Sequence, residues 1–137
     1  MPVVEELIRK DADGTLSFGN YLLDTKTKLS DFEYEGDLYK VKTFKEITKL
    51  EKNGLFVYES VEGTAVTGFR ITEDTVTMNV EGAEDTQITL GLEPDTEYKV
   101  SYDGTEIGNI KTKFNGKLVL SVELENGQAR SIVIAKA

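Results

Sequence analysis

The 137-residue sequence contains no cysteine, no histidine and no tryptophan. Without cysteine there are no disulfides, thiol nucleophiles or thiolate metal ligands. Without histidine there is no Ser-His-Asp triad, no imidazole base that titrates near neutral pH and no imidazole metal ligand. Any catalysis would have to rely on carboxylates, lysine or tyrosine. We therefore expect a protein that is not an enzyme and that holds no cofactor or metal.

Basic residues are scarce relative to acidic ones. The chain has 16 lysine and arginine residues against 25 aspartate and glutamate residues, a net charge of −9. This excess repels the phosphate backbone of nucleic acids and anionic lipid headgroups, so we expect no nucleic-acid and no membrane partner. The amino-terminal stretch lacks the basic segment and apolar run of a secretory signal. Together with the lack of cysteine this predicts a cytoplasmic location, with association to a surface or a virion left open.

Proline is also rare, with two residues, whereas turn-forming pairs are frequent. Five Asn-Gly or Asp-Gly pairs, which suit the positive φ angles of tight hairpins, lie at 13–14, 53–54, 103–104, 115–116 and 126–127. Near the carboxyl end, Leu118, Leu120, Val122 and Leu124 recur with the period of a half-buried strand. The pattern predicts an all-β fold, a Greek-key or jelly-roll-like β-sandwich of about ten to twelve short antiparallel strands.

We expect a single domain over residues 1–137, with a hairpin-rich part at 1–64 and a sandwich-like part at 65–137. Residues 3–10 are interpreted as a strand that folds back through the turn at 11–14 onto residues 15–23, and a short helix over 3–10 is the alternative. The Gly36-Asp37 pair is expected to form the next hairpin turn.

Residues 11–20 have the spacing of the second half of an EF-hand calcium loop. Asp11 and Asp13 fall on ligand positions, but the first ligand position falls on Arg9 and the last on Asn20. A fixed positive charge and the lack of a bidentate glutamate disfavour calcium. We therefore interpret this segment as a hairpin loop whose aspartates accept hydrogen bonds from nearby backbone amides.

The segment LEPDTEYKV at residues 92–100 resembles the corner of fibronectin type III and immunoglobulin-like sandwiches, and the resemblance covers about residues 70–102. It implies that Leu92 plugs the core, that Pro94 forms the turn and that the Tyr98 hydroxyl bonds to upstream backbone. The run from Gly91 to Leu124 is similar to a closing β-module of bacterial polysaccharide-degrading enzymes.

The whole chain resembles small proteins of anaerobic Firmicutes labelled endosialidase or endosialin-like, a label that implies sialidase activity. Sialidase sites use an arginine cluster on a β-propeller, and 137 residues cannot build one. The three arginines, Arg9, Arg70 and Arg130, are spread along the sequence. The adjacent carboxylates at 5–6, 73–74 and 84–85 would point to opposite faces of a strand. The residues therefore predict no glycosidase site, although a carboxylate-based hydrolase is kept as a third hypothesis.

The leading hypothesis is a structural or interaction protein that associates with itself through strand edges or a sheet face, giving an oligomer or a filament. The candidate assembly segments are the β-prone termini, which contain Val3, Val4, Leu7, Ile8, Ile132 and Ile134. The alternative is a carbohydrate- or peptide-binding module, in which Tyr34, Tyr39 and Tyr58 would form a platform for a sugar.

Overall fold

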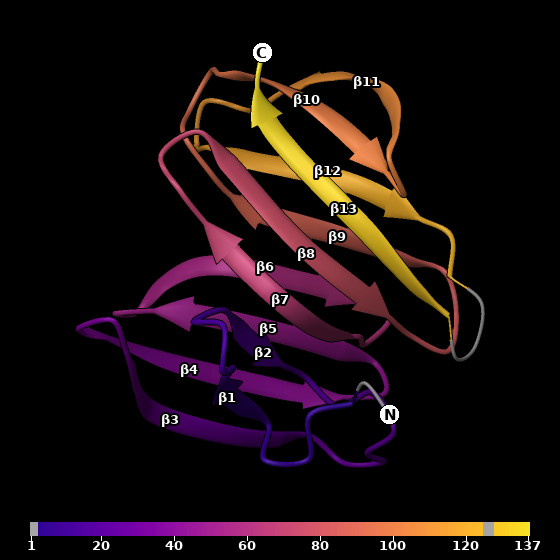
Figure 1. Cartoon of the computed structure of the whole chain (residues 1–137). Coiled ribbons are helices and arrows are strands. Elements are labelled where there is room, and N and C mark those ends of the chain that lie inside the picture. The colour runs from indigo at the N-terminus through magenta and orange to yellow at the C-terminus, as the bar shows by residue number, and fades with distance from the viewer. Residues whose placement is uncertain (1–2, 125–127) are drawn as a thin grey trace.

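The computed structural model describes residues 3–124 and 128–137, which form a two-layer β-sandwich with no helix in these ranges (Figure 1). The all-β prediction is confirmed, and the described residues contain 13 strands, slightly more than expected. The strands are β1 (Ile8–Lys10), β2 (Leu16–Phe18), β3 (Thr27–Tyr34), β4 (Asp37–Phe44), β5 (Ile47–Lys52), β6 (Leu55–Val61), β7 (Ala65–Ile71), β8 (Thr75–Glu81), β9 (Thr86–Gly91), β10 (Glu97–Tyr102), β11 (Thr105–Lys111), β12 (Lys117–Val122) and β13 (Ala129–Lys136).

Both sheets are antiparallel and combine strands from distant parts of the sequence. The seven-stranded sheet has the order β1-β2-β7-β8-β13-β10-β11, and the six-stranded sheet has the order β12-β9-β6-β5-β4-β3. The chain runs through β3 to β6 as a meander and afterwards crosses repeatedly between the sheets. Because β6 pairs with β9 and β2 pairs with β7, residues 1–64 and 65–137 share both sheets.

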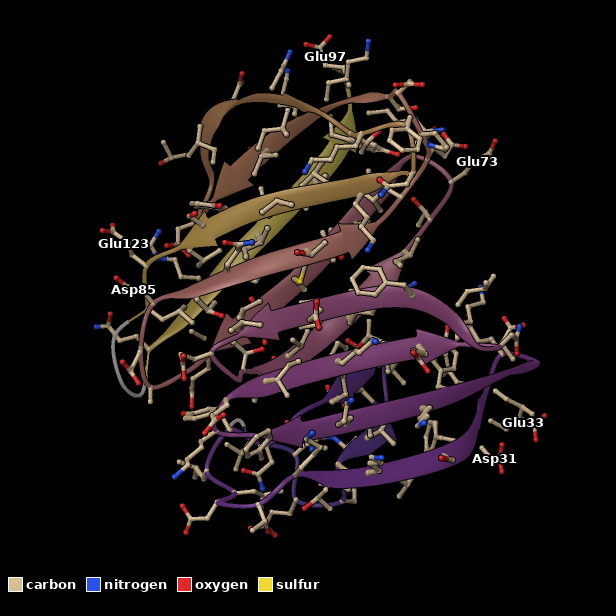
Figure 2. The ribbon with its side chains drawn as sticks, turned by 180° about the vertical axis from the view of Figure 1, so that it is seen from behind. Asp31, Glu33, Glu73, Asp85, Glu97 and Glu123 are labelled. Atoms are coloured by element: carbon tan, nitrogen blue, oxygen red, sulfur yellow. The ribbon has the colours of Figure 1, made fainter. Side chains whose placement is uncertain are left out.

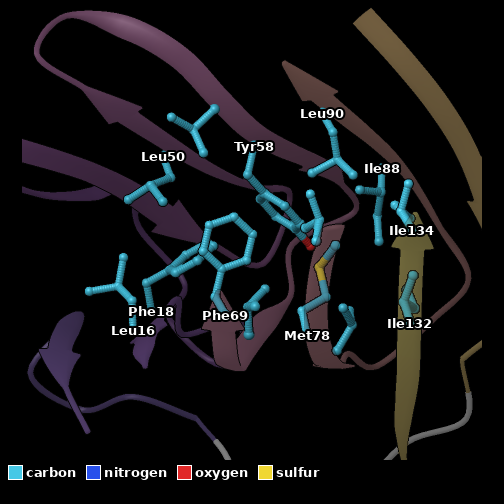
Figure 3. Packing of buried hydrophobic residues seen from close by; sticks show 14 of the residues in the cluster. Leu16, Phe18, Leu50, Tyr58, Phe69, Met78, Ile88, Leu90, Ile132 and Ile134 are labelled. Carbon is cyan, nitrogen blue, oxygen red and sulfur yellow. The ribbon is translucent and has the colours of Figure 1, made fainter. Parts of the chain in front are cut away.

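The main core lies between the two sheets, and Figure 3 shows part of it from close by. Val3, Tyr21 and Ala65 form a second, small cluster. The aromatic centre of the main core is Phe18. The centroid of the Phe18 ring lies 5.2 Å from that of Tyr58 and 5.4 Å from that of Phe69, and both pairs have edge-to-face geometry. Such pairs contribute about 0.5–1.5 kcal/mol beyond the burial of their area. Met78 and Ile132 extend the core toward the carboxyl-terminal strands.

The amino-terminal segment follows the strand interpretation only in part. Residues 8–10 pair with β2 through the predicted turn at 11–14, but residues 3–7 form turns and are neither strand nor helix. The strand expected at 15–23 is limited to Leu16–Phe18. The reason is a positive φ of 74° at Leu7, which breaks the extended chain before β1.

The Asn-Gly and Asp-Gly pairs at 13–14, 53–54 and 103–104 each lie in a hairpin turn, whereas the pair at 115–116 joins β11 to β12, which belong to different sheets. Asn53-Gly54 and Asp103-Gly104 have positive φ at both residues, as type I′ turns require. The β3–β4 turn, however, is Glu35-Gly36, with φ of 51° and 85°, and not Gly36-Asp37. Tyr34 therefore pairs with Asp37. The predicted turn at 126–127 lies outside the described residues.

The apolar residues expected to mediate assembly lie in the core of the chain itself. Five of them are buried, and these are Val3, Val4, Ile8, Ile132 and Ile134. Ile8, Ile132 and Ile134 lie in the main core, against which the half-buried Leu7 packs, and Val3 lies in the small second cluster. Strand β13, which contains Ile132 and Ile134, is hydrogen-bonded on both sides, to β8 and β10. Their assignment to an assembly surface is therefore wrong, because each side chain already packs within the sandwich.

Candidate functional site

Four strands form the edges of the two sheets: β1 is short, β12 is covered, and β11 and β3 each pair with their neighbour across a bulge. β1 has three residues, and β11 pairs with β10 across a bulge. On β12 the Lys117 carbonyl accepts from the Lys113 amide at 3.2 Å, and the Ser121 carbonyl accepts from the Tyr102 hydroxyl at 3.1 Å. Short and covered edges such as those of β1 and β12 are protected against pairing with another chain, and a bulge disturbs an edge only locally.

β3 is the longest edge strand, and its outer edge is open. In a hairpin closed by a two-residue turn, the residues that flank the turn exchange backbone hydrogen bonds, and every second pair after them does the same. On β3 these residues are Tyr34, Phe32 and, after a bulge, Leu29. The backbone N–H and C=O groups of Glu33 and Lys28 therefore point away from the sheet.

At the open edge of β3, the residues before the bulge and those after it carry opposite charges. Lys26 and Lys28 lie before the bulge, Asp31 lies in it, Glu33 and Glu35 lie after it, and all five side chains are exposed. Figure 2 shows Glu33 projecting away from the body of the sandwich at this strand. On the inner face, half-buried side chains of Leu29 and Phe32 pack at the margin of the core.

A cleft of about 240 Å³ opens beside the β3–β4 turn, at the end of the sandwich. It brings together Tyr34 and Tyr39, whose rings meet edge to face at 5.7 Å, but both residues are 9% exposed. Tyr58 lies elsewhere, fully buried in the core. The three tyrosines therefore form no platform, because their ring faces are covered and cannot stack on a sugar.

Within the segment at 11–20, residues 11–14 form a hairpin loop, as interpreted from the sequence, whereas Leu16–Phe18 is strand β2. Asp13 accepts a backbone amide as expected, but Asp11 bonds to side chains. Asp11 accepts hydrogen bonds from the hydroxyls of Thr15 and Ser17 and from Arg9, and Asp13 accepts the Thr15 amide at 3.0 Å. The Thr15 bonds lower the pKa of Asp13. Among the described residues no group of three or more carboxylates is placed to hold a metal ion.

The other residues singled out from the sequence do not converge on one site. Arg9 pairs with Asp11, Arg70 donates to the Asp13 carbonyl, and Arg130 lies near Asp103. At the predicted corner the buried Tyr98 accepts the Glu93 amide at 3.4 Å, a long hydrogen bond, beside the half-buried Leu92 and the exposed Pro94.

A row of lysines crosses the outer face of the six-stranded sheet, and the sequence alone does not reveal it. Lys42 of β4 lies directly between Lys28 of β3 and Lys49 of β5. Burial, followed by repulsion from Lys26, Lys49, Lys28 and Lys40, lowers the pKa of Lys42. Like charges directly opposite each other destabilise a sheet. The row could be found only once the strand register was known.

Replacing Lys42 by glutamate is expected to stabilise the fold by about 1 kcal/mol, because two repulsive cross-strand pairs become attractive. Lys42→Gln should give about half of this gain. Urea unfolding at low and high salt measures both variants, and the gain should shrink as salt screens the charges. A lower urea midpoint for Lys42→Glu than for the parent would contradict the assigned register.

No helix in the described part of the chain is long and apolar enough to cross a membrane. No family model, curated protein or solved structure matches the chain. Its membership in the group of endosialidase-labelled proteins therefore stays a prediction.

Proposed function

We propose that this protein is a non-enzymatic structural or interaction protein that pairs with a second copy of itself along β3. The single observation that supports the proposal is the charge pattern of the open β3 edge, which is complementary to itself when two copies run antiparallel. Pairing of this kind would join the six-stranded sheets of two copies into one continuous sheet, related by a two-fold axis.

The register follows from the bulge. With the two bulges facing each other at the two-fold axis, Lys28 lies opposite the partner's Glu33, and Leu29 lies opposite the partner's Phe32. Lys28 and Glu33 both lie on the outer face of the sheet, and Leu29 and Phe32 both lie on the inner face, so each pair shares a face. The edge-directed backbone groups of Lys28 and Glu33 also come opposite each other, as an antiparallel ladder needs.

Three contributions would stabilise the pair. Ladder hydrogen bonds satisfy backbone groups at the open edge, and two symmetric copies of the Lys28–Glu33 pair each contribute about 0.2–1 kcal/mol. The half-buried Leu29 and Phe32 lose further contact with water. Because a two-fold contact uses the same surface on both copies, it closes as a dimer and leaves no second β3 edge for growth.

Variants that reverse the charge at position 28, at position 33 or at both test the proposal. Lys28→Glu and Glu33→Lys alone each place like charges opposite one another twice, so each should weaken self-association at least about tenfold. The double variant, and an equimolar mixture of the two single variants, should restore it. Sedimentation equilibrium over a dilution series measures the masses, and circular dichroism checks that every variant is folded.

Two results would overturn the proposal. One is a parent protein that sediments as a monomer at every concentration up to the millimolar range. The other is a dimer that both single variants leave unchanged, which would place the contact on another surface. Lys99→Glu, an exposed lysine on β10 in the other sheet, serves as the matched charge control and should leave the mass unchanged.

A further inference from the structure

The cleft beside the β3–β4 turn is small and is lined by acidic and basic side chains together with tyrosines. Its walls come from the β3–β4 and β5–β6 hairpins and from the end of β7. Within about 240 Å³ it gathers two tyrosines, two carboxylates and two cationic side chains, which are Tyr34, Tyr39, Glu35, Asp37, Lys52 and Arg70. Leu16, Val57 and Phe69 form its apolar floor.

The hydroxyl of Tyr39 is the unusual group in this cleft. The residue is 9% exposed, yet its hydroxyl has no hydrogen-bond partner among the described residues, whereas the Tyr34 hydroxyl donates to the Gly14 carbonyl at 2.6 Å. No fully buried side-chain oxygen in the described chain lacks a partner. The Tyr39 hydroxyl is therefore open to the solvent in the cleft, and burial raises its pKa to about 12, so it keeps its proton.

The charged groups supply both acceptors and donors. Asp37 is ionised, because the Asn53 amide, which donates at 2.8 Å, and the Lys52 ammonium at 3.4 Å lower its pKa. Glu35 is exposed at the turn. Arg70 uses one terminal nitrogen to donate to the Asp13 carbonyl at 3.1 Å, and its guanidinium has further N–H groups.

We infer that this cleft binds one unit of a neutral sugar. Each sugar hydroxyl both donates and accepts, so it can satisfy a carboxylate and an ammonium or tyrosine hydroxyl together. An apolar ligand would remove these charges from water without replacing their hydrogen bonds. An anionic ligand would meet Glu35 and Asp37, and a cationic one would meet Lys52 and Arg70. Recognition would use hydrogen bonds, because the tyrosine ring faces are covered.

Ligand-observed NMR with glucose, galactose, mannose and N-acetylglucosamine as probes tests this inference on the full chain. We expect saturable binding of at least one probe, weakened about tenfold by Tyr39→Phe, which removes one hydrogen-bonding hydroxyl and keeps the ring. Tyr102→Phe, which removes a hydroxyl outside the cleft, is the matched control and should bind as the parent does.

Three outcomes would overturn the inference: no saturable binding of any probe up to high millimolar concentration, binding that Tyr39→Phe leaves unchanged, or tighter binding of glucuronate than of glucose. Thermal melting checks that Tyr39→Phe is folded. The Lys28→Glu variant separates this inference from self-association, because it alters the β3 edge without altering the cleft lining. It should bind the sugar as the parent does, whatever its mass.

Discussion

Replacing Thr48 by valine is expected to lower the free energy of unfolding by about 3 kcal/mol. The Thr48 hydroxyl bonds to the Thr43 hydroxyl at 2.8 Å, donates to the Thr64 carbonyl at 2.8 Å and accepts the Thr64 amide at 3.0 Å. All three residues are fully buried. Valine keeps the volume but leaves the Thr64 backbone without partners, and each unsatisfied buried group costs about 1–3 kcal/mol.

The effect is large because Thr48 belongs to a connected network. Thr64 bonds through its hydroxyl to Tyr58 at 2.8 Å and to Ser60 at 2.7 Å, and Thr43 accepts the Asn20 amide at 3.0 Å. The network joins β4, β5 and β6 where the chain crosses to the other sheet. Urea unfolding measures the loss, and Thr89→Val, at a half-exposed position on the outer face of β9, should be close to neutral. Equal losses for the two variants would refute the role of the network.

Replacing Gly19 by alanine should cost about 4 kcal/mol, from a disfavoured backbone conformation together with overpacking. Gly19 has a φ of 98°, a region that favours glycine. An added Cβ would overlap the Thr64 carbonyl oxygen and approach Thr48 Cγ2 at 3.1 Å, next to the buried network. Because typical domains are stable by about 5–15 kcal/mol, this single methyl group is expected to remove much of the total.

Gly54→Ala is the matched control for this prediction. Gly54 has a similar φ of 81°, but an added Cβ would meet no atom within 4 Å. It should cost about 1–2 kcal/mol, the conformational penalty alone. The difference between the urea midpoints of the two variants gives the part of the destabilisation at Gly19 that is due to the steric overlap. Similar midpoints would show that the backbone at Gly19 can move away from Thr64.

The sequence alone predicted the fold class and most hairpins, because these depend on neighbouring residues. A turn at Asn53-Gly54 needs two residues that tolerate positive φ, and the burial of Leu118, Leu120 and Val122 follows from their period of two. The polar network was not predictable, because threonine is common on both faces of a sheet. Only the position of Thr48 on the inner face of β5 shows that it is buried.

The functional surfaces depend on which strands become neighbours, and that was decided by the tertiary structure. Sequence alternation places Lys28 and Glu33 on opposite faces of a strand, but the bulge between Leu29 and Phe32 brings them to the same face. The terminal segments looked free to pair with another chain, yet β13 lies between β8 and β10. Edges, registers and clefts arise from contacts between residues far apart in the chain, and local pattern contains no information about those contacts.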